Sequence, residues 1–293
     1  MSSVPPREGP SLDATVPDVG LPSVDVALLD PAQLRPRGST RGQRRWTKLL
    51  LLLAASAVVL LFVQLASYRF PPYIVPDVPT ISRATWELLT EQRDEMVATL
   101  GRFALAMATA ILGGWLIGLV MGSQRYVGEF GEALTRILLA TPALSIILFV
   151  VLWFRSVEVR IFAVALVIAM PFYVTAVYEG VKSIDAEMVQ AVRQFRPRRF
   201  QVFKYVLLPH SIATVIMATK SVAGFTLRIV VFAEVLAATS GVGSSMVQAQ
   251  INFRIDLIFG WTVILVVFNF VLMALLDRVE RVLLKWRPEN AVG

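Results

Sequence analysis

The strongest candidates for functional residues in this sequence are the charged side chains that lie inside long apolar runs. Arg228 and Glu234 both fall in the second half of an apolar run over residues 211–236. A charge at the centre of a membrane helix costs about 2.5–3.5 kcal/mol even on lenient scales, so such residues are candidates for a role in binding or transport. The two stand six residues apart, which separates them by about 120° around a helix, so they need not pair within it.

Each of these charges also has a structural interpretation. In the functional interpretation, Arg228 faces a central path for solute through the membrane and attracts an anion. In the structural interpretation, it forms a salt bridge with another helix or extends its side chain towards the membrane surface. Glu234 is a second path candidate, or else it pairs across helices or with a loop. Lys220 and Arg102 lie nearer the ends of their apolar runs, and we interpret both as structural.

Catalytic and nucleotide-binding chemistry finds no support in the sequence. The chain has no cysteine and one histidine, His210, so thiolate and multi-histidine metal sites are excluded, and we expect no metal or cofactor. None of the five lysines follows a glycine, as a P-loop requires. We interpret His210 as a helix-end residue at a membrane boundary. The chain is therefore not expected to be an enzyme, and any ATP that drives it must be bound by another chain.

The composition indicates a protein of the lipid bilayer. Hydrophobic residues make up 56% and charged residues 17% of the 293 residues, and the mean hydropathy is +0.66, whereas about a quarter of a soluble domain is charged. The pattern predicts an all-α integral membrane fold with six spans, near residues 49–67, 96–121, 135–154, 161–181, 211–236 and 257–276. Gly114, Gly118 and Gly122 predict close helix contact in the second span.

The third span is predicted to be broken at Thr141 and Pro142. A proline inside a span frees carbonyl groups, which is tolerated where neighbouring helices or a cavity satisfy them. Both residues are therefore further candidates for the lining of a path through the membrane.

Basic residues are distributed unequally between the two sides that six spans define. Near the membrane, 18 lie on the side of both termini and six on the other side. This asymmetry predicts that both termini are cytoplasmic in a multi-pass protein of a bacterial inner membrane. The net charge of +7 does not indicate a nucleic-acid partner, because the arginines lie between apolar spans rather than on a soluble face.

The chain is expected to have four parts. Residues 1–43, rich in Pro, Gly, Ser and Asp, predict a disordered cytoplasmic tail. Residues 44–95 would form the first membrane helix and an external connection. The remainder is a core over residues 96–287, which contains a cytoplasmic loop over residues 182–209, followed by a short tail of residues 288–293.

A polar, basic stretch from Asp185 to Pro209 separates the fourth and fifth spans. Asp185 is a predicted helix N-cap, and Glu187 falls in the first turn, where the helix dipole favours an acid. Pro197 ends this short helix because it cannot donate the next backbone hydrogen bond and disfavours helical geometry in the residue before it. A second amphipathic run, residues 200–208, leads back into the membrane.

The spacing of this stretch resembles the signature cytoplasmic loop of ABC importer permeases, which has Glu-Ala-Ala, Gly and Ile-x-Leu-Pro slots. Here the slots hold Gln190-Ala191-Val192, Arg196 and Val206-x-Leu208-Pro209. Other pieces are similar to the permeases of nitrate, sulfonate, taurine and bicarbonate importers: Thr99-Leu100-x-Arg102, Thr141-Pro142-Ala143-Leu144, Tyr178-Glu179-Gly180-Val181, Ala233-Glu234 and residues 238–243. Gln190 and Arg196 replace the acid and the glycine of the family loop. The resemblance therefore does not fix which residues contact the ATPase or whether the coupling is altered.

The resemblance implies a permease subunit for a small, anionic solute such as a sulfonate, nitrate or carboxylate. It implies a second permease copy, two ATP-binding-cassette ATPase subunits and an extracytoplasmic solute-binding protein as partners. Residues 185–196 would be the coupling helix that docks on the ATPase. Its docking candidates are Glu187, Met188, Gln190, Ala191, Arg193, Gln194, Phe195 and Arg196.

Two other classes of protein remain as alternatives. An ATP-independent secondary transporter usually shows an internal inverted repeat, and none is evident between spans 1–3 and 4–6. A membrane-embedded enzyme would need a cluster of His, Asp or Glu within the spans, where only Glu234 is firmly placed. A purely structural scaffold would leave the spacing of the coupling stretch without a reason.

Overall fold

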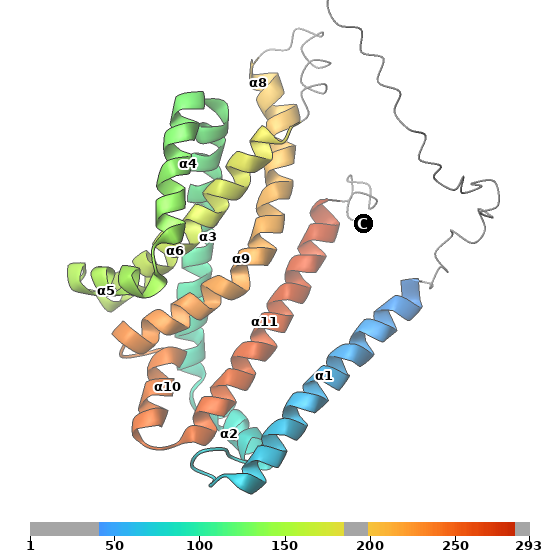
Figure 1. The fold of residues 1–293 in the computed structure, drawn as a ribbon, viewed down its shortest axis with the longest axis vertical. Helices are drawn as coiled ribbons and strands as arrows, with labels where there is room; N and C mark the ends of the chain where they lie inside the picture. The colour runs from blue at the N-terminus through green and yellow to red at the C-terminus, as the bar shows by residue number, and fades with distance from the viewer. Residues whose placement is uncertain (1–40, 185–198, 285–293) are drawn as a thin grey trace, which may run out of the picture. The chain divides into compact units, whose positions relative to one another are not determined.

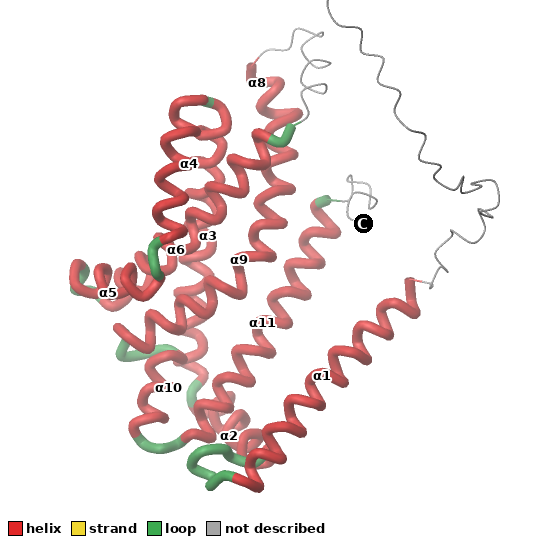
Figure 2. The backbone as a smooth tube through the Cα atoms, viewed as in Figure 1, coloured by secondary structure: helices red, strands yellow, loops and turns green. Residues whose placement is uncertain are grey.

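Helices make up the secondary structure of the residues that the structure describes (Figure 1 and Figure 2). The structure is a computed structural model, and it describes residues 41–184 and 199–284. The chain divides into two compact units, residues 1–58 and 59–293. The helices are α1 (Arg41–Arg69), α2 (Val78–Glu91), α3 (Arg93–Ser123), α4 (Arg125–Ala140), α5 (Ala143–Trp153), α6 (Val157–Lys182), α8 (Arg199–Val202), η2 (Phe203–Leu207), α9 (Leu208–Ala237), α10 (Val242–Ile251) and α11 (Ile255–Leu283).

The predicted all-α membrane fold is confirmed. Five stretches within the described residues are long and apolar enough to cross a bilayer: Leu50–Arg69, Arg93–Ser123, Val157–Lys182, Phe200–Ala237 and Ile255–Leu283. The pair α4 and α5 provides a sixth when it is counted as one broken span. We call the side where α6 ends and α8 begins the near side of the membrane, and the opposite side the far side.

The break in the third span falls at Thr141 and Pro142, as expected, and the two halves meet at 94°. Thr141 ends α4 with an extended ψ of 128°, because the ring of the following proline disfavours helical geometry there. Its N–H and hydroxyl both donate to the Ile137 carbonyl, at 3.1 and 2.8 Å, which satisfies the end of α4. Helix α4 begins at Arg125, ten residues earlier than the expected span.

Helices α3, α6 and α9 form the centre of the second unit and run side by side (Figure 1). The small-residue series of α3 faces α6. A Cβ atom at Gly118 or Gly122 would lie 2.7 Å from the Cβ atom of Val177 or Val181 respectively, so the two backbones approach too closely for any larger residue. The core around this contact is apolar and includes the fully buried Tyr173 and Val230.

Helix α2 closes the far side by packing on α11. Its apolar face buries Ala84 and Leu88 against Trp261, which has no exposed surface. Asp77 caps α2 by accepting the Thr80 N–H at 3.3 Å. Hydrogen bonding to Thr80, first through its side chain and then through its N–H, lowers the pKa of Asp77 below its usual value. The far-side connections are therefore ordered by packing and capping.

Helix α9 continues a near-side run of α8 and η2. The Leu208 N–H donates to the Phe203 carbonyl, five residues back, which is π-helical spacing. Pro209 follows with no N–H of its own to donate. Together the three elements make one apolar stretch from Phe200 to Ala237.

Candidate functional site

A buried polar cluster holds the far ends of three spans together, and Glu234 of α9 is at its centre. Glu234 has no exposed surface. Its carboxylate accepts from the Arg102 Nη1 atom at 2.7 Å, from the Thr99 hydroxyl at 2.8 Å and from the Gly243 N–H at 3.0 Å. Hydrogen bonding of this kind is what allows a carboxylate to be buried away from water.

Arg102 of α3 uses all five of its N–H donors in the same cluster. Besides Glu234, it donates to both carboxylate oxygens of Glu158 at 2.8 and 2.5 Å, and to the carbonyl and hydroxyl of Ser240 at 2.8 and 2.9 Å. A fork of donors in fixed geometry suits such a junction. Arg102 therefore joins α3, α6, α9 and the loop between α9 and α10, and we call this cluster the far-side clamp.

The loop that enters the clamp depends on Gly241. Its φ is +103°, which L side chains rarely adopt. Its N–H donates to Glu95, and a Cβ atom there would collide with the Glu234 carboxylate. The next N–H, of Val242, donates to the Thr99 hydroxyl at 2.8 Å. Gly241 and Gly243 of the motif at residues 238–243 thus lie directly against the Glu234 side chain.

The two path candidates of α9, Glu234 and Arg228, differ in burial and in hydrogen bonding. Glu234 pairs across helices, the structural interpretation given above, and offers no surface to a path in this conformation. Arg228 is exposed, and within the described residues it forms no hydrogen bond or ion pair. Lys220 on the same helix bonds Asp277 at 2.6 Å and Glu280 at 2.7 Å on α11. Arg228 therefore lacks the counter-ion that Lys220 and Arg102 have.

Arg228 lines a cavity of about 410 Å³ between α9, α10 and α11. The α9 residues of this cavity are Gly224, Leu227, Arg228, Val231, Phe232 and Val235, and the others are Met246, Thr262, Leu265, Val266, Asn269 and Phe270. The Asn269 Oδ1 atom is buried without a hydrogen-bond partner. Asn269 is not among the candidates predicted from sequence, where its one signal is a single amide inside an apolar span.

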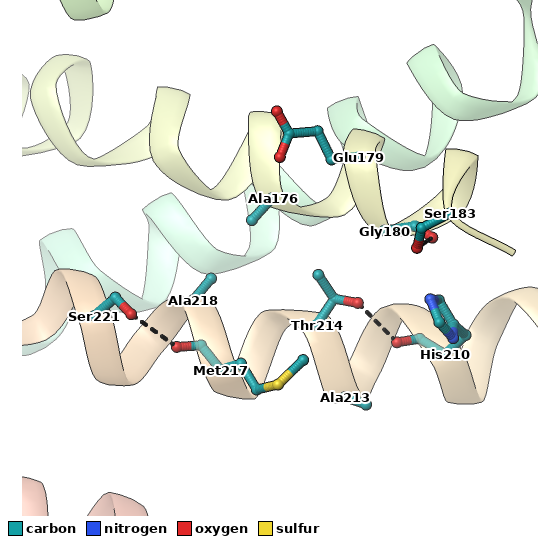
Figure 3. Close-up of a pocket in the computed structure, with 10 residues that line it drawn as sticks. All are labelled: Ala176, Glu179, Gly180, Ser183, His210, Ala213, Thr214, Met217, Ala218 and Ser221. Carbon is teal, nitrogen blue, oxygen red and sulfur yellow. Dashed lines mark hydrogen bonds between the residues drawn. The ribbon is translucent and has the colours of Figure 1, made fainter. Parts of the chain in front are cut away.

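A second cavity, of about 530 Å³, lies between the near-side ends of α6 and α9 (Figure 3). His210, Thr214 and Ser183 lie at the gap between the two helices, whereas the Glu179 carboxylate points away from α9. Gly180 lets the helices approach, because a Cβ atom there would lie 2.7 Å from the Thr214 hydroxyl. His210, interpreted from sequence as a helix-end residue, thus also borders a cavity.

The two cavities lie along one face of α9. Eight of the twelve α9 positions that line them recur every three or four residues, which places these eight on one side of the helix: His210, Thr214, Met217, Ser221, Gly224, Arg228, Val231 and Val235. This stripe, which we call the α9 face, runs from the near side to the far side. It carries hydroxyl, imidazole and guanidinium groups between apolar positions.

The remaining candidates lie elsewhere. Thr141 is half-buried and Pro142 is exposed at the break between α4 and α5, and neither lines the two cavities described. The eight docking candidates between Glu187 and Arg196 lie outside the described residues. On α6, just before that segment, Tyr178 donates to Glu132 of α4 at 3.2 Å and accepts from Lys182 at 3.3 Å.

This combination of broken and continuous spans, a far-side clamp and a cavity-lined helix face defines a polytopic membrane permease. Residues 110–285 match the sequence profile of the family described as "Binding-protein-dependent transport system inner membrane component". Because the match covers more than half of the chain, the protein belongs to this family of ABC transporter permeases. The family has no catalytic activity of its own: it pairs with a separate ATPase subunit and a solute-binding protein.

Curated relatives carry different cargo names. The chain is 27% identical over 195 residues to the taurine transport system permease protein TauC of Escherichia coli, covering 66% of this chain and 70% of that protein. It is 25% identical to the putative aliphatic sulfonates transport permease protein SsuC of Bacillus subtilis, covering 59% and 63%. It is 23% identical to the riboflavin transport system permease protein RibX of Chloroflexus aurantiacus, covering 74% and 82%.

Solved structures support the fold. A chain of the inward-facing MetNI methionine ABC transporter superposes with a TM-score of 0.54 at 18% identity, covering 66% of this chain and 97% of that one. A chain of an amino acid ABC transporter gives a TM-score of 0.53 at 15% identity, covering 64% and 90%. At these identities the likeness concerns the fold alone.

Proposed function

We propose that this permease subunit forms the path for a small anionic solute, such as a sulfonate or carboxylate, through an importer driven by ATP. The observation that carries the proposal is the α9 face, along which two cavities follow one another and Arg228 presents a positive charge with no ion-pair partner in residues 41–184 and 199–284. An unpaired cation within a span favours a passing anion and disfavours a cation. The names of the taurine and sulfonate permeases are consistent with such a cargo.

The proposed unit is a pair of identical subunits with both termini in the cytoplasm. Support for the orientation comes from the excess of basic residues on the near side. Support for a pair comes from Arg228, which is exposed on α9 and whose charge would be shielded from lipid by a second copy. Two ATPase subunits would then bind on the near side, with the solute-binding protein on the far side.

The proposed coupling element is the segment of residues 185–196. Closure of the two ATPases on ATP would move the two copies of this segment together and shift the permease between two conformations. Tyr178, Glu132 and Lys182 tie α4 to the end of α6 that precedes the segment. They would transmit such a movement to the spans, with the far-side clamp keeping the opposite ends of α3, α6 and α9 together.

Co-purification from detergent-solubilised native membranes tests this proposal. The unmodified chain is expected to retain an ATPase, and Ala191→Asp and Gln194→Asp are expected to lose it. Gln124→Asp is the matched control, because it makes the same change at an exposed site between α3 and α4 on the same side of the membrane. A chain that purifies without an ATPase and moves solute in proteoliposomes without ATP would instead be a secondary transporter.

A further inference from the structure

Of Arg102, Lys220 and Arg228, which lie within apolar runs predicted from sequence, only Arg228 has no ion-pair partner among the described residues. Arg102 is neutralised by Glu158 and Glu234, and Lys220 by Asp277 and Glu280. Arg228 stands nine residues, or about 14 Å, before the far end of α9. No acidic residue lines its cavity. A guanidinium in this position is stabilised by an anion that enters from outside the chain.

A second donor is available in the same cavity. The Asn269 Oδ1 atom is buried, and a Cβ atom at Gly224 would lie only 2.7 Å from it, so the oxygen end of the amide faces α9. The nitrogen end makes no hydrogen bond within the described residues and remains available to a ligand. Thr262 gives its hydroxyl proton to the Ile258 carbonyl at 2.8 Å, so it adds no donor. The Arg228 guanidinium and the Asn269 amide thus give one cavity two kinds of hydrogen-bond donor, and the oxygens of an oxyanion are suitable acceptors for both.

The rest of the cavity selects for an apolar body on that anion. Leucine, valine, methionine and phenylalanine side chains form its other walls, among them Phe232, Leu265 and Phe270. At about 410 Å³ the cavity lies within the size range of small-molecule sites. Because no carboxylate lines it, an ammonium group on the solute would have no partner and would be desolvated at a cost.

We propose that Arg228 and Asn269 form a binding site for the oxyanion group of a short alkyl or aryl sulfonate or carboxylate, whose apolar body contacts the α9 and α11 side chains. The inference rests on the proposed function and narrows its cargo. It selects organic anions over nitrate or bicarbonate, which have no apolar body. It also selects simple sulfonates over zwitterionic aminosulfonates such as taurine.

Thermal unfolding of the full-length protein in detergent, with ethanesulfonate as the probe, tests the site. A ligand that binds the folded state raises Tm in a concentration-dependent way. Ethanesulfonate is expected to raise Tm, whereas the neutral ethyl methyl sulfone, taurine and sodium nitrate at the same concentration raise it less. Arg228→Gln is expected to weaken ethanesulfonate binding by about tenfold to a hundredfold, because it removes charge-assisted hydrogen bonds.

Two substitutions at Asn269 distinguish the contribution of its amide group from that of its side-chain size. Asn269→Leu keeps a similar size and removes the donor, so binding should weaken by about tenfold. Asn269→Asp places an acid in the cavity as an internal partner for Arg228, and should abolish the response without lowering Tm in the absence of ligand. Arg83→Gln on the exposed face of α2, outside the cavity, is the control and should bind as the unmodified chain does.

The proposal is overturned if Arg228→Gln binds ethanesulfonate as tightly as the unmodified chain, if the neutral sulfone binds as well as the sulfonate, or if ethanesulfonate does not shift Tm at all. Co-purification of the ATPase is measured on the same preparations. If the ATPase co-purifies but ethanesulfonate does not bind at Arg228, the proposed site is wrong and the proposed importer function is unaffected. Loss of the ATPase from the unmodified chain would count against the proposed function itself.

Discussion

Arg102 on α3 donates to Glu234 on α9 at 2.7 Å, across 132 residues of sequence and with less than a tenth of either side chain exposed. This pair is the centre of the far-side clamp. It fixes the ends of three spans at a point where neither residue is free to contact a solute. With Glu158 of α6, the pair connects the far ends of α3, α6 and α9.

Breaking one partner of this pair should destabilise the protein strongly. Arg102→Met leaves the Glu234 carboxylate buried without its cation, which costs about 3–5 kcal/mol. Unfolding in detergent followed by circular dichroism would measure the loss as a fall in Tm. The double change Arg102→Met with Glu234→Leu should recover a large part of it, because no charge then remains buried.

The control for this prediction is a pair at the surface. Arg125 and Glu129 form an exposed ion pair on α4 at 2.9 Å. Glu129→Gln should change stability by less than about 1 kcal/mol. Equal effects of Glu129→Gln and Arg102→Met on Tm would contradict the assignment of the clamp.

The glycines of α3 should differ sharply in their tolerance of a methyl group. Gly118→Ala would place a Cβ atom 2.7 Å from the Cβ atom of Val177, so α3 and α6 must separate, and Tm should fall. Gly101→Ala meets nothing within 4 Å and should raise stability by about 0.5–1 kcal/mol through helix propensity. Melting curves of the Gly118→Ala and Gly101→Ala variants test this prediction. An undiminished Tm for Gly118→Ala would show that the close contact between α3 and α6 is not needed.

The two cations of α9 should respond in opposite ways to neutralisation. Lys220→Gln breaks ion pairs with Asp277 and Glu280 that join α9 to α11, so Tm in the absence of solute should fall. Arg228→Gln removes a charge with no partner among the described residues, so Tm should stay the same or rise. If both variants lost stability equally, Arg228 would have a structural partner rather than a site for solute.

Tyr178 offers a test of the near-side connection. Tyr178→Phe keeps the ring and removes the hydrogen bonds to Glu132 and Lys182, which should cost about 1 kcal/mol. In the assembled transporter the same variant should hydrolyse more ATP for each solute moved, because α4 is less firmly tied to α6. The ratio of hydrolysis to uptake in proteoliposomes measures this. An unchanged ratio together with a lower Tm would assign Tyr178 to stability alone.

Much of the fold was predictable from local sequence. Long apolar runs located the spans, and Thr141-Pro142 located the break, because a proline acts on its immediate neighbours. The partner of Glu234 was not predictable. Arg102 is 132 positions away, and no sequence pattern connects the two residues. Glu158 lay just before the expected fourth span and carried no signal for its part in the clamp.

The site along α9 also has features that local sequence predicts and features that depend on the fold. The charge of Arg228 was evident from the sequence, whereas its lack of a partner among the described residues depends on where the chain folds the acidic residues of α11. Asn269 was missed because one amide in an apolar run has no periodic pattern. Its importance comes from Gly224, whose missing Cβ atom leaves room for the amide oxygen.

Uptake of labelled ethanesulfonate into proteoliposomes that contain the complete co-purified complex tests the central claim most directly. The account predicts ATP-dependent uptake by the unmodified complex and by Arg83→Gln. For Arg228→Gln it predicts an initial rate lower by about tenfold or more, with the ATPase still bound. Equal uptake by Arg228→Gln, or uptake that continues without ATP, would contradict the account.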